Sequence, residues 1–195
     1  MARSRAKNTQ GSTLRIIGGQ WRGRKVPFHA AAGLRPTPDR VRETVFNWLA
    51  ADVPGARCAD LFAGSGALGL EALSRGAAHC VFVDTNDATL AGLSAALQAL
   101  GGDAHGQIVS GTAAQFCAQG ADPFDILFID PPFADGLVEP CCELLDVHGL
   151  VARGGAVYIE MSSREDAPVV PGSWTLWRDK QAGEVAYRLY RVGEV

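Results

Sequence analysis

The residues best suited to chemistry form the short segment Asp130-Pro131-Pro132-Phe133. It follows the apolar run 124–129, which is typical of a buried parallel strand. Two prolines cannot continue a strand ladder, so the chain must turn out of the sheet there. The turn leaves a carboxylate, a stiff backbone carbonyl and an aromatic ring at the carboxyl end of a strand, where open α/β sheets bind ligands.

This combination suits a planar heterocycle that carries an exocyclic NH2 group. The Asp130 carboxylate and the Pro131 carbonyl can each accept one N–H bond, which would hold the amine and direct its delocalised lone pair toward an electrophile. Phe133 can stack on the base. The alternative interpretation is an ordinary loop of two prolines, in which Asp130 caps the next turn.

A second motif lies upstream, where a strand ends near Phe62 and a glycine turn leads into a helix. The run 64–69 fits G-x-G-x-x-G, and Asp84 follows Gly64 by 20 residues. In this dinucleotide fingerprint, glycines let the ligand approach the backbone and the acid binds ribose hydroxyls. Alone it does not separate NAD from other adenosine cofactors, and a glycine turn without a ligand has the same pattern. Beside an amine-orienting Asp-Pro-Pro-Phe, it favours S-adenosyl-L-methionine and an amino methyl acceptor.

With both motifs in place, the chain resembles the RsmD family of 16S rRNA guanine-N2 methyltransferases. The resemblance covers nearly the whole chain beyond the first dozen residues, and Asp84-Thr85 departs from the commoner pattern of an acid followed by a hydrophobic or acidic residue. It implies methylation of a guanine of the 966 type in 16S rRNA, free or in an assembly intermediate of the small ribosomal subunit. The matching segments, in order, are 14–24, 34–43, 62–75, 130–133 and 185–190.

The motifs and the resemblance together assign the site. The glycine turn would take the methionine and ribose part of the cofactor, Asp84 the ribose hydroxyls, and Thr112-Ala113 would border the adenine. Asp60 would support the turn or contact the methionine amine. The expected cofactor-binding residues are Asp60, Phe62, Gly64, Ser65, Gly66, Asp84, Thr112 and Ala113, and the expected catalytic residues are Asp130, Pro131, Pro132 and Phe133.

Charge is distributed unevenly along the chain. Residues 1–42 contain ten Lys and Arg and one acid, whereas residues 43–195 contain eight Lys and Arg and twenty acids. This asymmetry predicts a nucleic-acid-binding arm on an acidic body, the alternative being a solvated basic tail. Trp21 would either stack on a base or pack the arm onto the body. The expected RNA-binding residues are Arg22, Arg24, Lys25, Arg35, Arg40 and Arg42, of which the last two lie on a helix that the resemblance also places over the methionine end of the cofactor.

Size and composition fit one cytoplasmic domain. The chain has 195 residues, with no apolar run near the ~20 residues of a membrane span and no apolar signal region at its start. Its five cysteines lack C-x-x-C spacing and its four histidines are far apart, so we expect reduced thiols and no metal. We expect a monomer.

Strand and helix patterns alternate after residue 57, which predicts a Rossmann-like α/β sheet, mostly parallel, with helices on both faces. Two later strand patterns, 174–177 and 185–190, predict an antiparallel hairpin closing the sheet's edge, as in class I methyltransferases. Thr37 is expected to N-cap a helix with Pro38 at its first position. The expected domains are a disordered basic tail (1–12), an N-terminal hairpin and linker (13–36) and a methyltransferase domain (37–195). Strands are expected near 57–62, 79–84, 107–110, 125–130 and 155–160, and helices near 67–75, 86–100, 112–119 and 136–147.

Three other functions share some of these features. An NAD-linked oxidoreductase would use the same glycine turn, but no His, Tyr-Lys pair or Cys near a strand end is placed for hydride chemistry. A non-enzymatic RNA-binding assembly factor would not need the intact Asp130 motif. An adenine-N6 DNA methyltransferase would use the same amine chemistry and is the closest alternative.

Overall fold

A seven-stranded sheet forms the centre of the molecule. The computed structural model describes residues 12–28 and 37–193. The strands lie in the order β5-β4-β3-β6-β7-β9-β8; the first five in this order are parallel, and β9 is antiparallel to β7 and β8. Their bounds are β3 (Arg57–Asp60), β4 (His79–Asp84), β5 (Gly106–Ser110), β6 (Phe124–Ile129), β7 (Val151–Ser162), β8 (Trp174–Ala182) and β9 (Val185–Val192).

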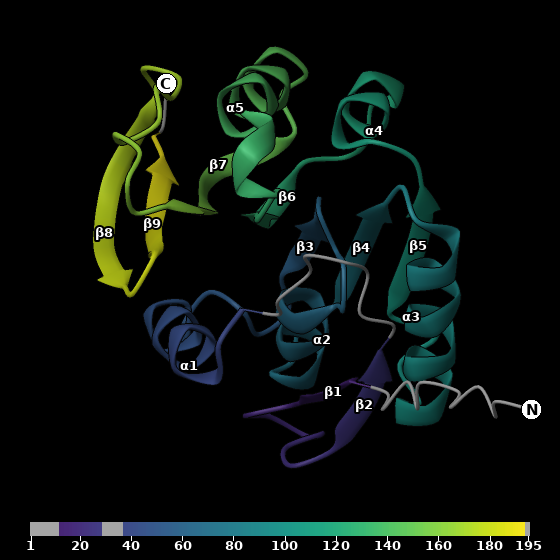
Figure 1. Cartoon of the computed structure of the whole chain (residues 1–195). Coiled ribbons are helices and arrows are strands. Elements are labelled where there is room, and N and C mark those ends of the chain that lie inside the picture. The colour runs from purple at the N-terminus through teal and green to yellow at the C-terminus, as the bar shows by residue number, and fades with distance from the viewer. Residues whose placement is uncertain (1–11, 29–36, 194–195) are drawn as a thin grey trace, which may run out of the picture.

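Helices cover both faces of this sheet (Figure 1). One face packs against α1, α2 and α3, and the other against α4 and α5. Strand side chains alternate between the two cores, so that Phe128 packs on the α1 side and Leu127 on the α5 side. Because both faces are buried, the central residues of β4, β6 and β7 are mainly apolar. The helices are α1 (Asp39–Trp48), α2 (Ala67–Ser74), α3 (Asp87–Leu100), α4 (Ala113–Gln119), α5 (Val138–Val147) and the short 3-10 helix η1 (Phe133–Asp135).

Local sequence explains most helix ends. The Asn86 side chain accepts a hydrogen bond from the Thr89 N–H at 3.0 Å and begins α3, which ends at Gly101 in the left-handed conformation. The start of α1 differs from expectation. Its N-cap is Pro38, without a side-chain cap, so the prediction that Thr37 caps this helix was wrong. The Thr37 hydroxyl instead donates to Asp130.

The N-terminal hairpin packs beside α2 and α3. Its strands are β1 (Ser12–Arg15) and β2 (Lys25–Phe28), and β1 begins inside the segment expected to be a tail. The loop between them is anchored by Glu71 of α2, whose carboxylate accepts the N–H groups of Ile17 and Gly18 at 2.8 and 2.7 Å. Trp21 is buried against Gly102, so it packs the hairpin onto the body and is not free to stack on a base.

The predicted fold class is confirmed, including the antiparallel last strand. The main difference lies in the order at the edge: β9 is inserted between β7 and β8, so β8 is the edge strand. Among the described residues, no helix is long and apolar enough to cross a membrane.

Candidate active site

The strand order reverses at β3, which has β4 on one side and β6 on the other. Such a switch point leaves a crevice at the carboxyl ends of the strands, where ligands bind in open α/β sheets. Acidic residues gather there: Asp60 ends β3, Asp84 ends β4, Asp130 follows β6, and Glu160 lies near the end of β7. The two sequence motifs therefore meet at one place.

The glycine turn after β3 needs its glycines for two different reasons. Gly64 and Gly66 have φ of 50° and 75°, in the left-handed region that favours glycine. A Cβ on Gly69 would lie 2.3 Å from the Phe82 ring, so this glycine allows α2 to pack closely on β4. Ser65 is buried, whereas Phe62 is half-buried. A tight turn and close packing of the helix on the sheet are two of the roles that glycines have in this fingerprint.

Two carboxylates hold the turn in shape. Asp84 accepts the Gly64 N–H at 2.8 Å through Oδ2 and the Asn86 N–H at 2.8 Å through Oδ1. Asp60 accepts the Gly69 N–H at 3.0 Å and is 2% exposed. Asp60 was expected either to support the glycine turn or to contact the methionine amine. Its hydrogen bond from the Gly69 N–H corresponds to the first of these roles. Burial, with the nearby charges of Asp130 and Asp84, raises the pKa of Asp60 to about 7 although the Gly69 N–H opposes the shift.

Asp130-Pro131-Pro132-Phe133 leaves the sheet directly after β6. Pro131 is buried, Pro132 precedes η1, and the Phe133 side chain is 38% exposed. The Thr37 hydroxyl donates to Asp130 Oδ2 at 3.2 Å. Burial raises the pKa of the Asp130 carboxyl to about 6, and the Thr37 hydrogen bond pulls it in the opposite direction. Asp130 is thus a half-buried acceptor that is charged at neutral pH.

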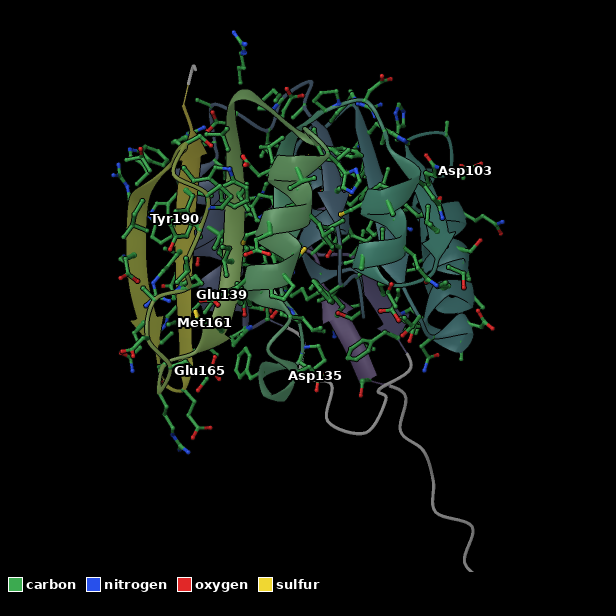
Figure 2. The ribbon with its side chains drawn as sticks, turned by 90° about the horizontal axis from the view of Figure 1, so that it is seen from above. Asp103, Asp135, Glu139, Met161, Glu165 and Tyr190 are labelled. Atoms are coloured by element: carbon green, nitrogen blue, oxygen red, sulfur yellow. The ribbon has the colours of Figure 1, made fainter. Side chains whose placement is uncertain are left out.

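A cavity of about 260 Å³ opens beside this motif. Its wall includes Pro131, Pro132 and Phe133 on one side and the segment after β7 on the other. Figure 2 shows Asp135, Glu139, Met161 and Glu165 on this side of the molecule, with Asp103 toward the opposite edge. The polar lining is acidic, comprising Glu139, Glu160, Glu165 and Asp166. Such a wall accepts hydrogen bonds and repels phosphate.

Thr112 and Ala113 lie just beyond the carboxyl end of β5. Thr112 is exposed and caps α4, its hydroxyl accepting the Gln115 N–H at 3.1 Å in a capping box. Ala113 is buried. Both therefore lie at the same edge of the sheet as Asp84, although the Thr112 hydroxyl already has a structural partner.

The residues expected to bind RNA are divided between the N-terminal hairpin and α1. The hairpin loop contacts the carboxyl ends of α2 and α3: Trp21 N donates to Ser74 Oγ at 3.0 Å, and Arg24 Nη2 to the Ala99 carbonyl at 2.9 Å. Arg22, Arg24 and Lys25 are exposed. The next residues of β2, Val26, Pro27 and Phe28, line a small pocket together with Gly64 and Ser65, so β2 runs from these basic residues toward the glycine turn.

The remaining three arginines differ among themselves. Arg40 is exposed in the first turn of α1, close to Thr37, and Arg35 lies outside the described residues. Arg42 is only 1% exposed and pairs with Asp39 at 2.6 Å and with Glu71 at 3.5 Å. This burial contradicts the expectation that Arg42 contacts RNA. Its guanidinium instead joins α1 to α2.

Sequence reasoning missed two polar neighbours of Asp130. Thr37 was assigned to a helix cap, and Glu160 was placed only at the end of a strand. The available signal was the alternation along β7: Glu160 is the one charged residue in an otherwise uncharged run, 155–162. A charge in a strand buried on both faces needs a partner.

Sheet order, the antiparallel β9, the glycine turn and the Asp-Pro-Pro-Phe motif together define a class I methyltransferase fold. The solved structure of the Escherichia coli protein yhhF superimposes with a TM-score of 0.87 at 48% identity, covering 93% of this chain and 99% of that one. A structure from Haemophilus influenzae gives 0.81 at 36% identity, covering 94% and 100%.

Sequence comparisons identify the family. The family model described as conserved hypothetical protein 95 matches residues 14–191. Ribosomal RNA small subunit methyltransferase D of E. coli K12 is 50% identical over 179 residues, which is 91% of this chain and 89% of the relative. The H. influenzae protein of the same name is 38% identical over 195 residues, covering 98% and 100%. The chain therefore belongs to the RsmD family.

Proposed function

We propose that the protein uses S-adenosyl-L-methionine to methylate the exocyclic N2 amine of a guanine in small-subunit 16S rRNA. The observation that carries this proposal is the Asp130-Pro131-Pro132-Phe133 motif after β6, whose last three residues line the cavity, at the same carboxyl edge of the sheet as the glycine turn after β3. The names of the two relatives support ribosomal RNA as the substrate. We further propose, from the family resemblance, that the target is a guanine of the 966 type.

The residues present fit an adenosyl cofactor. Gly64 and Gly66 offer a backbone without side chains, and each Asp84 oxygen accepts one backbone N–H. A carboxylate has about four lone-pair sites, so Asp84 can also accept ribose hydroxyls. When bound, the cofactor supplies a methyl group on a positively charged sulfonium. Ser65 and Phe62 would flank the methionine and ribose part, with Asp60 holding the turn and Thr112 and Ala113 beside the adenine.

The protein's main contribution is alignment of the amine. Asp130 Oδ1 and the Pro131 carbonyl would accept the two N–H bonds, because Oδ2 already receives the Thr37 hydroxyl. Holding two reactants in line is worth about 7–11 kcal/mol. As the amine becomes cationic, the Asp130 carboxylate stabilises the developing charge.

The cavity beside Phe133 is the natural place for the target base. Its volume of about 260 Å³ is slightly smaller than that of typical small-molecule pockets, whose range begins at about 300 Å³. Guanine presents N–H donors on the edge that carries N2, and the cavity wall supplies carboxylate acceptors. The base must be unpaired or flipped out to enter. Phe133→Ala should weaken RNA binding by about 1–3 kcal/mol if the ring stacks on this base.

Contacts to the RNA backbone would then come from surfaces outside the cavity. Arg40 lies near the site, and the exposed Arg22, Arg24 and Lys25 are positioned for phosphates of the flanking RNA on the hairpin, whose strand β2 leads to the glycine turn. Arg35 belongs to the same proposed surface by sequence. The acidic cavity wall excludes phosphate, so the backbone must pass around it.

The test is methyl transfer from isotopically labelled cofactor to 16S rRNA and to small ribosomal subunits, followed by digestion and identification of the labelled nucleoside. The proposal predicts labelled N2-methylguanosine, lost in Asp130→Ala. Label in N6-methyladenosine would indicate the adenine chemistry instead, and RNA binding without transfer would indicate an assembly factor.

A further inference from the structure

A second carboxyl group lies beside Asp130. The parallel ladder between β6 and β7 pairs Ile129 with Ile159, which brings the next residues, Asp130 and Glu160, together. Side chains alternate along a strand, so Asp130 and Glu160 point to the same face as Phe128 and therefore toward α1. Glu160 is 2% exposed, and it also lines the 260 Å³ cavity.

Hydroxyl groups connect the two carboxyls. The Tyr158 hydroxyl donates to Glu160 Oε1 at 2.7 Å, and the Thr37 hydroxyl donates to Asp130 Oδ2 at 3.2 Å. Thr37 is also close enough to Glu160 to lower the pKa of that carboxyl. Thr37 is therefore a neighbour of both acids, and the Tyr158 hydroxyl holds Glu160 Oε1.

We propose that Glu160 is a positioning residue for methyl transfer, acting through the Thr37 hydroxyl to orient Asp130 and leaving Asp130 as the single negative charge of the pair. This rests on the proposed function. A protonated Glu160 donates its O–H to Thr37, and Thr37 then donates to Asp130 Oδ2. With one oxygen held in this way, Asp130 Oδ1 is directed to the target amine.

The surroundings favour one proton on the pair. Two adjacent buried carboxyls do not both ionise readily. Burial and the charge of Asp130 raise the pKa of Glu160 well above its ordinary value, whereas the pKa of Asp130 rises only to about 6. Because Glu160 is 2% exposed and Asp130 is half-buried, the shared proton is expected on the more deeply buried Glu160. Among the described residues, acidic groups and tyrosines face the pair: Asp60 on β3 with Asp84 beyond it, Tyr158 on β7, Tyr187 on β9, Glu139 on α5, and Glu165 and Asp166 after β7. A cation of α1 also lies near Thr37, since Arg42 Nε donates to the Thr37 carbonyl at 3.2 Å, but its charge is paired with Asp39 and Glu71.

The pH dependence of kcat/KM separates this role from a merely structural one. Thr37→Val removes the hydrogen bond that lowers the pKa of Asp130, so the acid limb should move to higher pH, while Thr37→Ser should keep it in place. For each pH unit by which the acid limb moves upward, kcat/KM at a pH below the limb falls about tenfold. Glu160→Gln is neutral like the protonated acid, so its limb should stay at the wild-type position. Asp103→Asn, an exposed change at the far edge, is the control that should leave the profile unchanged.

Two outcomes would overturn the inference: an unshifted limb in Thr37→Val, or a limb moved to lower pH in Glu160→Gln, which would mean that Glu160 is charged in the wild type. A wild-type protein without transferase activity would instead overturn the proposed function. In that case, a 13C NMR titration of labelled carboxyls still tests the pair. Glu160 should titrate well above Asp130 in the wild type, and simultaneous or reversed titration would contradict the assignment. Thermal melting of each variant confirms that it is folded.

Discussion

Replacing Glu71 by glutamine tests how the basic hairpin is held on the catalytic body. The Glu71 side chain is fully buried and accepts the N–H groups of Ile17 and Gly18 and the Nε–H of Arg75 at 2.7–2.8 Å. Arg42 Nη1 lies 3.5 Å away and has no hydrogen-bond partner among the residues that the structure describes. One carboxylate thus joins the hairpin, α1 and α2.

The expected loss of stability is large because the change leaves buried partners without a counter-charge. Removing one member of a buried ion pair costs about 3–5 kcal/mol. For a chain of this size, 1 kcal/mol corresponds to about 2–4 °C in Tm, so Glu71→Gln should melt about 6–20 °C below the wild type. Glu43→Gln is the matched control, since Glu43 is exposed on α1 and its loss should change stability by no more than about 0.5 kcal/mol.

Urea unfolding gives the free energy, and limited proteolysis reports on the hairpin. The variant should be cut first within residues 16–24, whereas Glu43→Gln should resist like the wild type. A Glu71→Gln protein that loses less than about 1 kcal/mol and keeps its hairpin protected would refute the anchoring role.

Three further changes probe the site. Asp84→Ala should weaken cofactor binding by about 1.5–3 kcal/mol in calorimetry, because charged hydrogen bonds to the ribose are lost; unchanged affinity would contradict that assignment. Asp130→Ala should lower kcat about 10²–10³-fold while the affinity for the cofactor is retained. Wild-type kcat should rise as the pH passes about 6, where Asp130 loses its proton. Near-normal turnover in the variant would reopen the hypothesis of a non-enzymatic RNA-binding factor. Changing Arg22, Arg24 and Lys25 together to Ala should raise the Kd for RNA and reduce its salt slope by about 0.7–0.9 per lost phosphate contact, measured by salt titration; normal methylation at physiological salt would make the hairpin loop a solvated appendage.

The sequence predicted those structural features of the candidate site that are local in the chain. The glycine turn at Gly64 and Gly66 and the position of Asp130 after a strand depend on turn geometry and strand ends, which short motifs encode directly. The alternating strand and helix patterns likewise predicted the sheet, because a parallel strand buried on both faces has a recognisable apolar composition.

The sequence did not predict contacts that depend on register and packing. Thr37 meets Asp130 across 93 residues, and Glu160 meets it only because β6 and β7 pair in one particular register. Likewise, a count of positive charges could not separate Arg42, buried beside Glu71, from the exposed Arg40. Burial depends on how α1 packs on α2, which the residues of α1 alone do not specify.

The most direct test of the central claim uses RNA in which the target guanine is replaced by inosine, which lacks only the N2 amine. Asp130, Pro131 and Phe133 are proposed to act on that amine, so wild-type protein should transfer labelled methyl groups to the guanine RNA and none to the inosine RNA, while binding both. Equal methyl transfer to the inosine RNA would contradict the account, because the accepting atom would then lie elsewhere on the base.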